Sequence, residues 1–137
     1  MGDSGFSESN VFENVQLYLK MWLEKSGGTR LDVKYTALGS TGMIRFWMTM
    51  DGQKKSVRVS ESAGSAVASL RGAQASPERG AWFYSHLWVE LPEGVLYQES
   101  DWMCAPDTES DADLGAYKTE LDRYPRDQEF IPDWLRD

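Results

Sequence analysis

Apolar and polar residues recur along this chain with two periods, one typical of helices and one typical of strands. Residues 9–25 carry apolar side chains at three- and four-residue spacing, and Ser26-Gly27-Gly28 follows them. That spacing places one apolar stripe along one side of a helix. The stripe consists of Phe12, Val15, Leu19, Trp22 and Leu23. The pattern predicts an amphipathic helix over 9–25 that packs on a sheet.

Three segments that follow predict an antiparallel meander. Residues 31–37 alternate strictly between apolar and polar, which is typical of a half-buried strand. Residues 43–50 are apolar on both faces, which favours a central position in the sheet or a covered outer face. Asp51-Gly52 is a strong hairpin turn, and residues 54–60 follow it as a third strand.

The second half of the chain predicts a helix, a hairpin and a terminal helix. Small residues over 60–71 favour a helix, and 81–91 has the strongest strand pattern of the chain. A Pro-Glu-Gly turn joins that strand to its hairpin partner, 95–102. The acidic segment 105–113 precedes a helix over 114–124, which a proline ends.

The element order is therefore α-β-β-β-α-β-β-α. Runs of strands flanked by helices indicate the α+β class rather than a parallel α/β sheet. We expect a single domain over residues 1–137, with an antiparallel sheet of about five strands and helices packed mainly on one face. Its length suffices to bury a sizeable core.

The C-terminal tail is unusually apolar. Chain ends are commonly polar, yet Tyr124, Phe130, Ile131, Trp134 and Leu135 lie close together here. Leaving such side chains in water is unfavourable by roughly 25 cal/mol per Å² of apolar surface. The tail is therefore expected to dock on its own domain or on a partner.

Charge is distributed unevenly along the chain. The net charge is −8, and residues 69–137 hold fifteen Asp/Glu against six Lys/Arg, whereas residues 1–68 are close to neutral. An acidic field repels phosphate backbones and steers basic proteins into contact. The negative charge of the second half disfavours nucleic-acid binding. It fits a role in solubility and a role in binding a basic partner equally well.

Cysteine usage and hydropathy suggest a cytoplasmic protein. Cys104 is the single cysteine, so no internal disulfide can form. The chain has no apolar run of roughly 20 residues, the length that spans a bilayer. Its N-terminus lacks the basic and apolar regions of a signal peptide. Neither a membrane nor an oxidising compartment is therefore expected.

Catalytic and metal-binding chemistry find little support. Cys104 and His86 are the one conceivable thiol–imidazole pair, and no recognisable motif surrounds either. One His and one Cys cannot supply a usual transition-metal site. Asp107, Glu109, Asp111 and Asp113 alternate like calcium ligands, but the segment lacks the central Gly and terminal Glu of the known calcium loop. We expect no enzyme, no cofactor and no metal.

The tail also carries a family resemblance. Its sequence Tyr124-Pro-Arg-Asp-Gln-Glu-Phe-Ile-Pro-Asp-Trp-Leu135 resembles the ending of small actinobacterial proteins related to the YezG-like immunity family. The Gly80-Ala-Trp-Phe83 strand start matches as well. Members of that family are encoded beside polymorphic toxins and neutralise them by binding. The resemblance implies an immunity protein that occludes the active site of a cognate toxin.

A binding surface can be placed on the strongest strand. Alternation puts Trp82, Tyr84, His86 and Trp88 on one sheet face, and Arg45 and Trp47 of the second predicted strand are expected to extend it. The residues expected to bind a partner are Trp82, Tyr84, Trp88, Glu99, Asp101, Trp102, Asp107, Glu109, Asp111 and Asp113. Exposed aromatics would anchor the partner, and the acidic residues would meet its basic surface.

Two other interpretations stay open. Phe130 and Trp134 of the tail could cover the aromatic row, which would make it part of the core. Alternatively, a cleft beside the aromatic face could hold an apolar small molecule, as in a regulatory binding module. A thiol enzyme that uses Cys104 is the weakest alternative. The sequence leaves the oligomeric state undecided.

Overall fold

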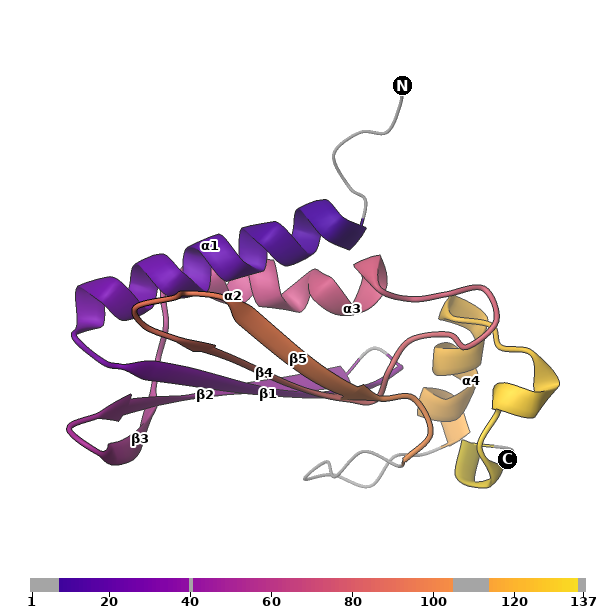
Figure 1. Cartoon of the computed structure of the whole chain (residues 1–137). Helices are drawn as coiled ribbons and strands as arrows, with labels where there is room; N and C mark the ends of the chain where they lie inside the picture. Colours follow the sequence, from indigo (N-terminus) through magenta and orange to yellow (C-terminus); the bar gives the residue numbers. More distant parts are fainter. Residues whose placement is uncertain (1–7, 40, 105–113, 136–137) are drawn as a thin grey trace.

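The computed structural model describes residues 8–39, 41–104 and 114–135 of this chain. It contains helices and a single sheet in the order expected for an α+β domain (Figure 1). The helices are α1 (Glu8–Ser26), α2 (Glu61–Ala68), α3 (Leu70–Ala73) and α4 (Leu114–Arg123), with 3-10 turns η1 (Gln128–Phe130) and η2 (Asp133–Leu135). The strands are β1 (Arg30–Leu38), β2 (Thr41–Met50), β3 (Gln53–Val57), β4 (Tyr84–Glu90) and β5 (Leu96–Asp101).

The sheet is antiparallel throughout, with the strand order β3-β2-β1-β4-β5. The predicted meander of the first three strands is confirmed. Asp51 and Gly52 both have positive φ, 53° and 77°, as the tight turn of a twisted hairpin requires. The middle strand is β1. β2, for which the sequence favoured a central position or a covered outer face, is an interior strand one place in from the edge, paired with β1 and β3.

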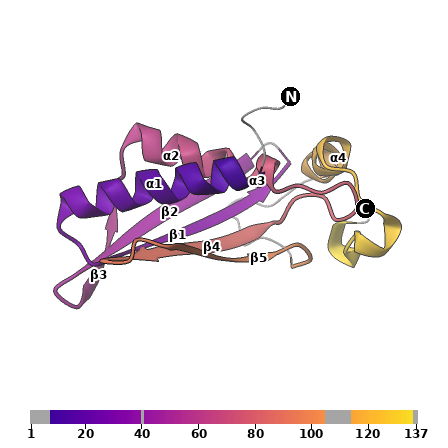
Figure 2. The same ribbon diagram turned by 45° about the horizontal axis from the view of Figure 1, so that its top comes forward.

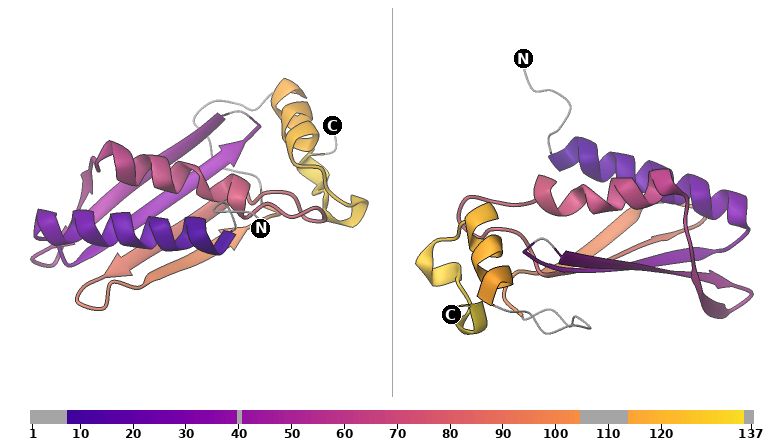
Figure 3. Two further views of the ribbon diagram at one scale, coloured as in Figure 1. Left: turned by 90° about the horizontal axis from the view of Figure 1, so that it is seen from above. Right: turned by 180° about the vertical axis from the view of Figure 1, so that it is seen from behind.

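Helices α1, α2 and α3 cover one face of the sheet, as expected (Figure 1). Viewed from above, α1 and α2 lie side by side over the strands (Figure 3). α4 and the C-terminal turns instead lie at the end of the sheet (Figure 2). The predicted helix over 60–71 is divided between α2 and α3, and the strand predicted over 54–60 ends at Val57.

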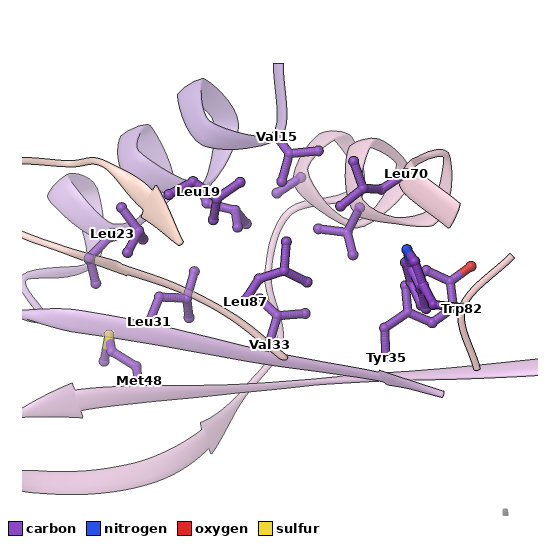
Figure 4. Packing of buried hydrophobic residues seen from close by; sticks show 14 of the residues in the cluster. Val15, Leu19, Leu23, Leu31, Val33, Tyr35, Met48, Leu70, Trp82 and Leu87 are labelled. Carbon is purple, nitrogen blue, oxygen red and sulfur yellow. The ribbon is translucent and has the colours of Figure 1, made fainter. Parts of the chain in front are cut away.

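The main core lies between α1 and the sheet. Val15, Leu19 and Leu23 of the predicted stripe are fully buried and point toward Leu31 and Leu87 of the sheet (Figure 4). Burying each such side chain contributes roughly 1.5–3 kcal/mol. The helical period of α1 therefore meets the alternating period of β1 and β4 in one apolar layer.

The tail docks on its own domain. Leu38, Phe83 and Leu135 form a second buried cluster, and the ring of Trp134 meets that of Phe83 edge-on, with centroids 4.8 Å apart. Arg126 fastens the tail, because its guanidinium donates 2.7 Å hydrogen bonds to the carbonyl oxygens of Ala81, Trp102 and Phe130. Burial lowers the pKa of Arg126 to about 10. The sequence predicted that the tail docks on its own domain or on a partner, and in the structure it docks on its own domain.

Candidate functional site

Among the described residues, no helix lies over the sheet face opposite α1, α2 and α3 (Figure 1, Figure 2). We call it the open face. It presents alternate residues of the strands, because their neighbours point into the core. They are Arg30, Asp32, Lys34 and Thr36 of β1; Met43, Arg45, Trp47 and Thr49 of β2; Lys54 and Ser56 of β3; Tyr84, His86, Trp88 and Glu90 of β4; and Tyr97, Glu99 and Asp101 of β5.

A row of aromatic side chains crosses the open face around one carboxylate. Asp32 lies directly opposite Trp47 on one side and Trp88 on the other. Trp88 lies opposite Tyr97, and the two rings stack with centroids 5.6 Å apart and planes 20° apart. Tyr97 is 51% exposed, and neither the tail nor any other described element covers it. The stack forms a flat apolar contact area at one side of the face.

Asp32 organises the middle of this face. It is 1% exposed, and Arg30 donates to both of its carboxylate oxygens, from Nε to Oδ2 at 3.0 Å and from Nη2 to Oδ1 at 2.9 Å. His86 Nε2 lies 2.9 Å from Oδ1, and Lys54 Nζ lies 3.8 Å from Oδ2. Burial alone would raise the pKa of Asp32, but the hydrogen bonds from Arg30 and His86 hold it below its usual value.

These contacts also order the aromatic rings. The Arg30 guanidinium lies over the Trp88 ring, 5.5 Å from its centroid, and the Lys34 ammonium lies at the same distance over Trp47. The His86 ring packs against Trp88 with centroids 4.9 Å apart. Because each ring is held by a cation or another ring, these side chains have little rotamer freedom left to lose on binding.

Four residues expected to bind a partner meet on the open face. Tyr84 lies directly opposite Asp101, and Glu99 lies opposite His86, while Trp88 belongs to the aromatic row. Burial, followed by the charge of Glu99, raises the pKa of Tyr84. The alternation of the hairpin was therefore sufficient to bring Tyr84, Trp88, Glu99 and Asp101 together.

Trp82 does not join them. Its side chain is 0% exposed and packs in the main core, edge-on to Tyr35 at 4.9 Å between centroids, with its indole N–H donated to Gln74 Oε1. The prediction that Trp82 shares a face with Tyr84 and Trp88 is wrong. The regular strand begins only at Tyr84, so strict alternation cannot be extended back through Phe83 to Trp82.

Trp102 lies away from the aromatic row of the open face. Trp102 follows the end of β5, and the Arg79 guanidinium lies over its ring at 4.0 Å from the centroid. Its buried indole nitrogen has no hydrogen-bond partner among the described residues. The expected binding residues Asp107, Glu109, Asp111 and Asp113 lie outside the described part of the chain.

A polar cleft borders Trp102 on the helix side of the sheet. Its lining comprises Gln74, Ser76, Glu78, Arg79, Gln98, Ser100 and Trp102. The Gln74 and Gln98 side chains bond to each other at 2.7 Å, and Gln98 Nε2 donates to the hydroxyl oxygens of Ser85 and Ser100. This cleft fits a polar ligand better than the apolar one expected beside the aromatic face, because amides and hydroxyls line it.

His86 and Cys104, the conceivable thiol–imidazole pair, each contact a different carboxylate. His86 bonds to Asp32, whereas the backbone N–H of Cys104 donates to Asp101 Oδ1 at 2.9 Å. Hydrogen bonding to the Asp101 carboxylate raises the pKa of the exposed Cys104 thiol. Reactive cysteines have lowered pKa values, since the thiolate is the nucleophile. The surroundings of Cys104 therefore disfavour nucleophilic chemistry.

Several residues of the open face escaped the sequence analysis. Arg30, Asp32 and Lys34 occupy the polar positions of the alternating segment 31–37 and its start, so the pattern did contain a signal for them. Their polarity suggested a solvated face and gave no hint that Asp32 is buried. Tyr97 similarly follows from the alternation of β5.

A scan against protein-family models, a search of curated proteins and a search of solved structures find no match to this chain. Within the described ranges, no cluster of three His, Cys, Asp or Glu side chains could hold a metal ion. None of the helices in those ranges combines the length and apolarity needed to cross a membrane. The geometry of the open face is therefore the basis for assigning a function.

Proposed function

We propose that this chain is a cytoplasmic immunity protein that binds a cognate toxin domain with its open face and occludes the toxin's active site. The observation that supports it best is the aromatic row around Asp32, with Trp47, Trp88 and the stacked Tyr97 on a sheet face that no described helix covers. The resemblance of residues 124–135 to YezG-like proteins points to the same role.

The composition of the open face suits a protein interface. Trp, Tyr and Arg are the residues that most often dominate binding energy between proteins. Here Trp88, Tyr97 and Arg30 form one contiguous stack, with ring and guanidinium faces in contact. Large rings of low conformational entropy supply contact area at a small ordering cost.

Rigidity of the supporting sheet favours inhibition by steric blocking. The open face spans a five-stranded sheet whose other side is packed against α1, α2 and α3 (Figure 2). A broad, preformed face can lie across the mouth of a partner's active site without inserting a loop. The proposal thus needs neither a catalytic residue nor a cofactor in this chain.

The test compares two tyrosines on opposite sides of the domain. Tyr97→Ala removes the exposed member of the stack, and Tyr18→Ala removes a ring of α1 that is 40% exposed. Binding to the toxin domain encoded beside this chain is measured by calorimetry, together with rescue of growth during coexpression. We expect Tyr97→Ala to weaken binding by about tenfold or more, as for an interface anchor, and Tyr18→Ala to change it little.

The alternative function, a small-molecule binding module, rests on the cleft beside Trp102. The buried indole N–H of Trp102 has no hydrogen-bond partner among the described residues, and Trp102 lines the cleft together with Gln98 and Ser100. A ligand that accepts a hydrogen bond there would be polar. Trp102→Phe separates the two functions, because it removes the donor, keeps an aromatic ring and leaves the open face unchanged. Toxin binding that survives this change supports the immunity role.

A further inference from the structure

Strand β2 is longer than the strand that borders it at one side of the sheet. β3 pairs only with residues 46–50 of β2 and ends at Val57. The chain then leaves the sheet and rises to α2 (Figure 1). Residues 41–45 of β2 therefore have β1 on one side and, among the described residues, no strand on the other. We call this half of β2 the free edge.

The hairpin determines which backbone groups of the free edge point outward. Met50 and Gln53 close a two-residue turn, which is the place of a hydrogen-bonded pair. Hydrogen bonding alternates along an antiparallel strand, so even-numbered residues of β2 face β3 and odd-numbered residues face β1. The Thr49 carbonyl agrees, since it accepts a 2.8 Å bond from the segment before β1. Ile44 and Gly42 thus direct their N–H and C=O groups out of the sheet, and no described residue bonds to them there.

A groove with a volume of about 640 Å³ lies between the free edge and α2. Its apolar lining consists of Ile44, Phe46, Val57 and Val59, which are partly buried and pack against the main core. Gly64 of α2 also lines the groove, and a Cβ at that position would meet no atom within 4 Å. Apolar surface and unpaired backbone groups therefore lie next to each other.

Both features favour the same kind of occupant. Unpaired N–H and C=O groups at a sheet edge accept an additional strand, because its main chain supplies their partners. Directly opposed residues of two antiparallel strands have their side chains on the same face. Residues of an added strand opposite Ile44 and Gly42 would therefore point into the groove, on the side of α2. The residue between them would face the other side of the sheet.

Arg58 indicates the charge at one end of the occupant. It follows directly after β3, is exposed and lines the groove. It forms no ion pair with Glu61, which also lines the groove, or with any other carboxylate in the described ranges. A strand that runs antiparallel to β2 begins at this end of the free edge. A carboxylate just before its first apolar residue would complement the charge of Arg58.

We propose that the free edge is a strand-addition site for an extended segment of a partner protein. The segment runs antiparallel to β2 and carries an acidic residue followed by two apolar residues at alternate positions. The apolar residues lie opposite Ile44 and Gly42, and the acidic residue lies beside Arg58. The site goes beyond the proposed function, because the groove lies on the α2 side of the sheet and the open face on the other.

The probe is a capped pentapeptide of aspartate, valine, threonine, valine and threonine, titrated into the ¹⁵N-labelled protein. Amide shifts followed by NMR should centre on the free edge and on α2. Methyl groups on both valine nitrogens remove the two donors that face the free edge, so binding should weaken about tenfold or more. A methyl group on the nitrogen of the threonine between them points away from the edge and should change binding little. Shifts elsewhere, or equal effects of the two modifications, overturn the proposal.

Two leucine variants test the groove from the side of the protein. Gly64→Leu fills the groove and suits the helix, because leucine is a better helix former than glycine. Ser62→Leu is the matched control, since Ser62 is exposed on α2 and lines a different groove, beside α1. Gly64→Leu should weaken peptide binding about tenfold or more by steric exclusion, and Ser62→Leu should not. Equal affinities of the two variants overturn the proposal.

Two arginine variants test the acidic residue of the segment. Arg58→Glu places a negative charge beside the aspartate of the peptide and should weaken binding about fivefold or more at low ionic strength. Arg123→Glu, an exposed change in α4, should leave it constant. Equal binding by both variants overturns the assignment of an acidic residue to the segment.

Hydrogen exchange tests the pairing itself. The peptide should slow amide exchange at Gly42 and Ile44 and leave Met43 unchanged, because Met43 faces β1. Protection of Gly42 and Ile44 in the free protein equal to that of Met48, which faces β3, overturns the existence of the free edge.

The same measurements identify competing occupants. Undiminished binding of the peptide methylated at both valines assigns the groove to apolar ligands and overturns strand addition. Sedimentation that shows a dimer abolished by Gly64→Leu assigns the free edge to a second copy of the chain and overturns the partner protein. A monomer in which Gly42 and Ile44 gain protection only with the peptide supports the proposal.

Discussion

Arg71 and Glu120, 49 positions apart in the chain, form a buried ion pair in which Arg71 Nη2 donates to Glu120 Oε2 at 2.7 Å. Glu120 accepts a second hydrogen bond, of 2.8 Å, from the backbone N–H of Gly39 at the turn after β1. Arg71 Nε donates to the carbonyl oxygen of Trp82 at 2.7 Å. Two side chains thus join α3, α4, the β1–β2 turn and the segment that leads into β4.

Removing the carboxylate of Glu120 should destabilise the domain strongly. Glu120→Ala leaves Arg71 buried without its counterion and the N–H of Gly39 without its acceptor, so we expect a loss of about 3–5 kcal/mol in the free energy of unfolding. Denaturant unfolding measures the loss. Asp122→Ala is the control, because Asp122 pairs with Lys118 on the exposed side of α4 and should contribute less than about 1 kcal/mol. Similar midpoints for the two variants would contradict the central role of the pair.

The docked tail can be tested at two adjacent residues. Leu135 is 1% exposed, so Leu135→Ala should lower the free energy of unfolding by about 2–5 kcal/mol. Trp134 is partly exposed, but it donates its indole N–H to the Met103 carbonyl at 2.7 Å and packs on Phe83. Trp134→Ala should therefore cost about 2 kcal/mol, below the value for a fully buried ring. Unchanged denaturant midpoints in both variants would mean that the tail does not dock in solution.

The Asp32 network should be visible in the pH dependence of stability. The folded-state pKa of Asp32 lies below its ordinary value of 3.8, so its carboxylate stabilises the fold above that pH. The contribution is lost as the pH falls below 3.8 through the folded-state pKa. Asp32→Asn should accordingly be less stable than the wild type at neutral pH, with a difference that shrinks in acid. Denaturant unfolding between neutral pH and pH values below 3.8 gives that difference.

The control for this pH dependence is Asp122→Asn, which changes an exposed carboxylate of α4. Its stability difference from the wild type should vary little over the same range. A pH-independent difference for Asp32→Asn would show that the carboxylate acts through packing or hydrogen bonding alone.

Much of the fold follows from local patterns, and the exceptions share one physical origin. The stripe of α1, the alternation of β1 and the Asp51-Gly52 turn each depend on residues close in sequence, and all three were predictable. The Arg71–Glu120 pair and the burial of Asp32 depend on residues that only the folded chain brings together. From the sequence alone, polar residues in those positions are interpreted as exposed to solvent, because no neighbouring residue in the sequence indicates their partners.

The residues of the candidate site likewise fall into those that local alternation placed correctly and those that it did not. Alternation located Tyr84, Trp88, Glu99 and Asp101 correctly on one face, since each lies within a regular strand. It misplaced Trp82, which lies before β4 begins and bonds to Gln74 of the segment after α3. The row of Trp47, Asp32 and Trp88 also depends on the strand order, because β1 lies between β2 and β4.

Cys104 should be unreactive, and Asp101 should be the reason. The Asp101 carboxylate raises the pKa of the Cys104 thiol, which lowers the thiolate fraction at neutral pH. Asp101→Asn removes the negative charge and should shift the pH profile of reaction with a disulfide reagent to lower pH.

Cys104→Ala should keep toxin binding intact. Loss of protection with an intact fold would instead restore the thiol as a functional group.

The kinetics of toxin capture should separate steering from anchoring. Asp107, Glu109, Asp111 and Asp113 add four negative charges in one short segment, and charges act at long range on the association rate. Converting them to Asn and Gln should slow association with a basic part of the toxin at low ionic strength, with little effect on dissociation. Added salt should remove the difference, because the Debye length falls to about 8 Å at physiological ionic strength.

Trp88→Ala should show the opposite behaviour. The ring of Trp88 is held between Tyr97, His86 and Arg30, so its loss removes a preorganised contact without changing the net charge. The association rate should stay nearly constant, and dissociation should become faster by about tenfold or more, as is usual for an anchor residue. Stopped-flow mixing with the toxin domain at several salt concentrations measures both rates. Salt-independent association of the wild type would assign the acidic segment to solubility and leave the open face to act through contact alone.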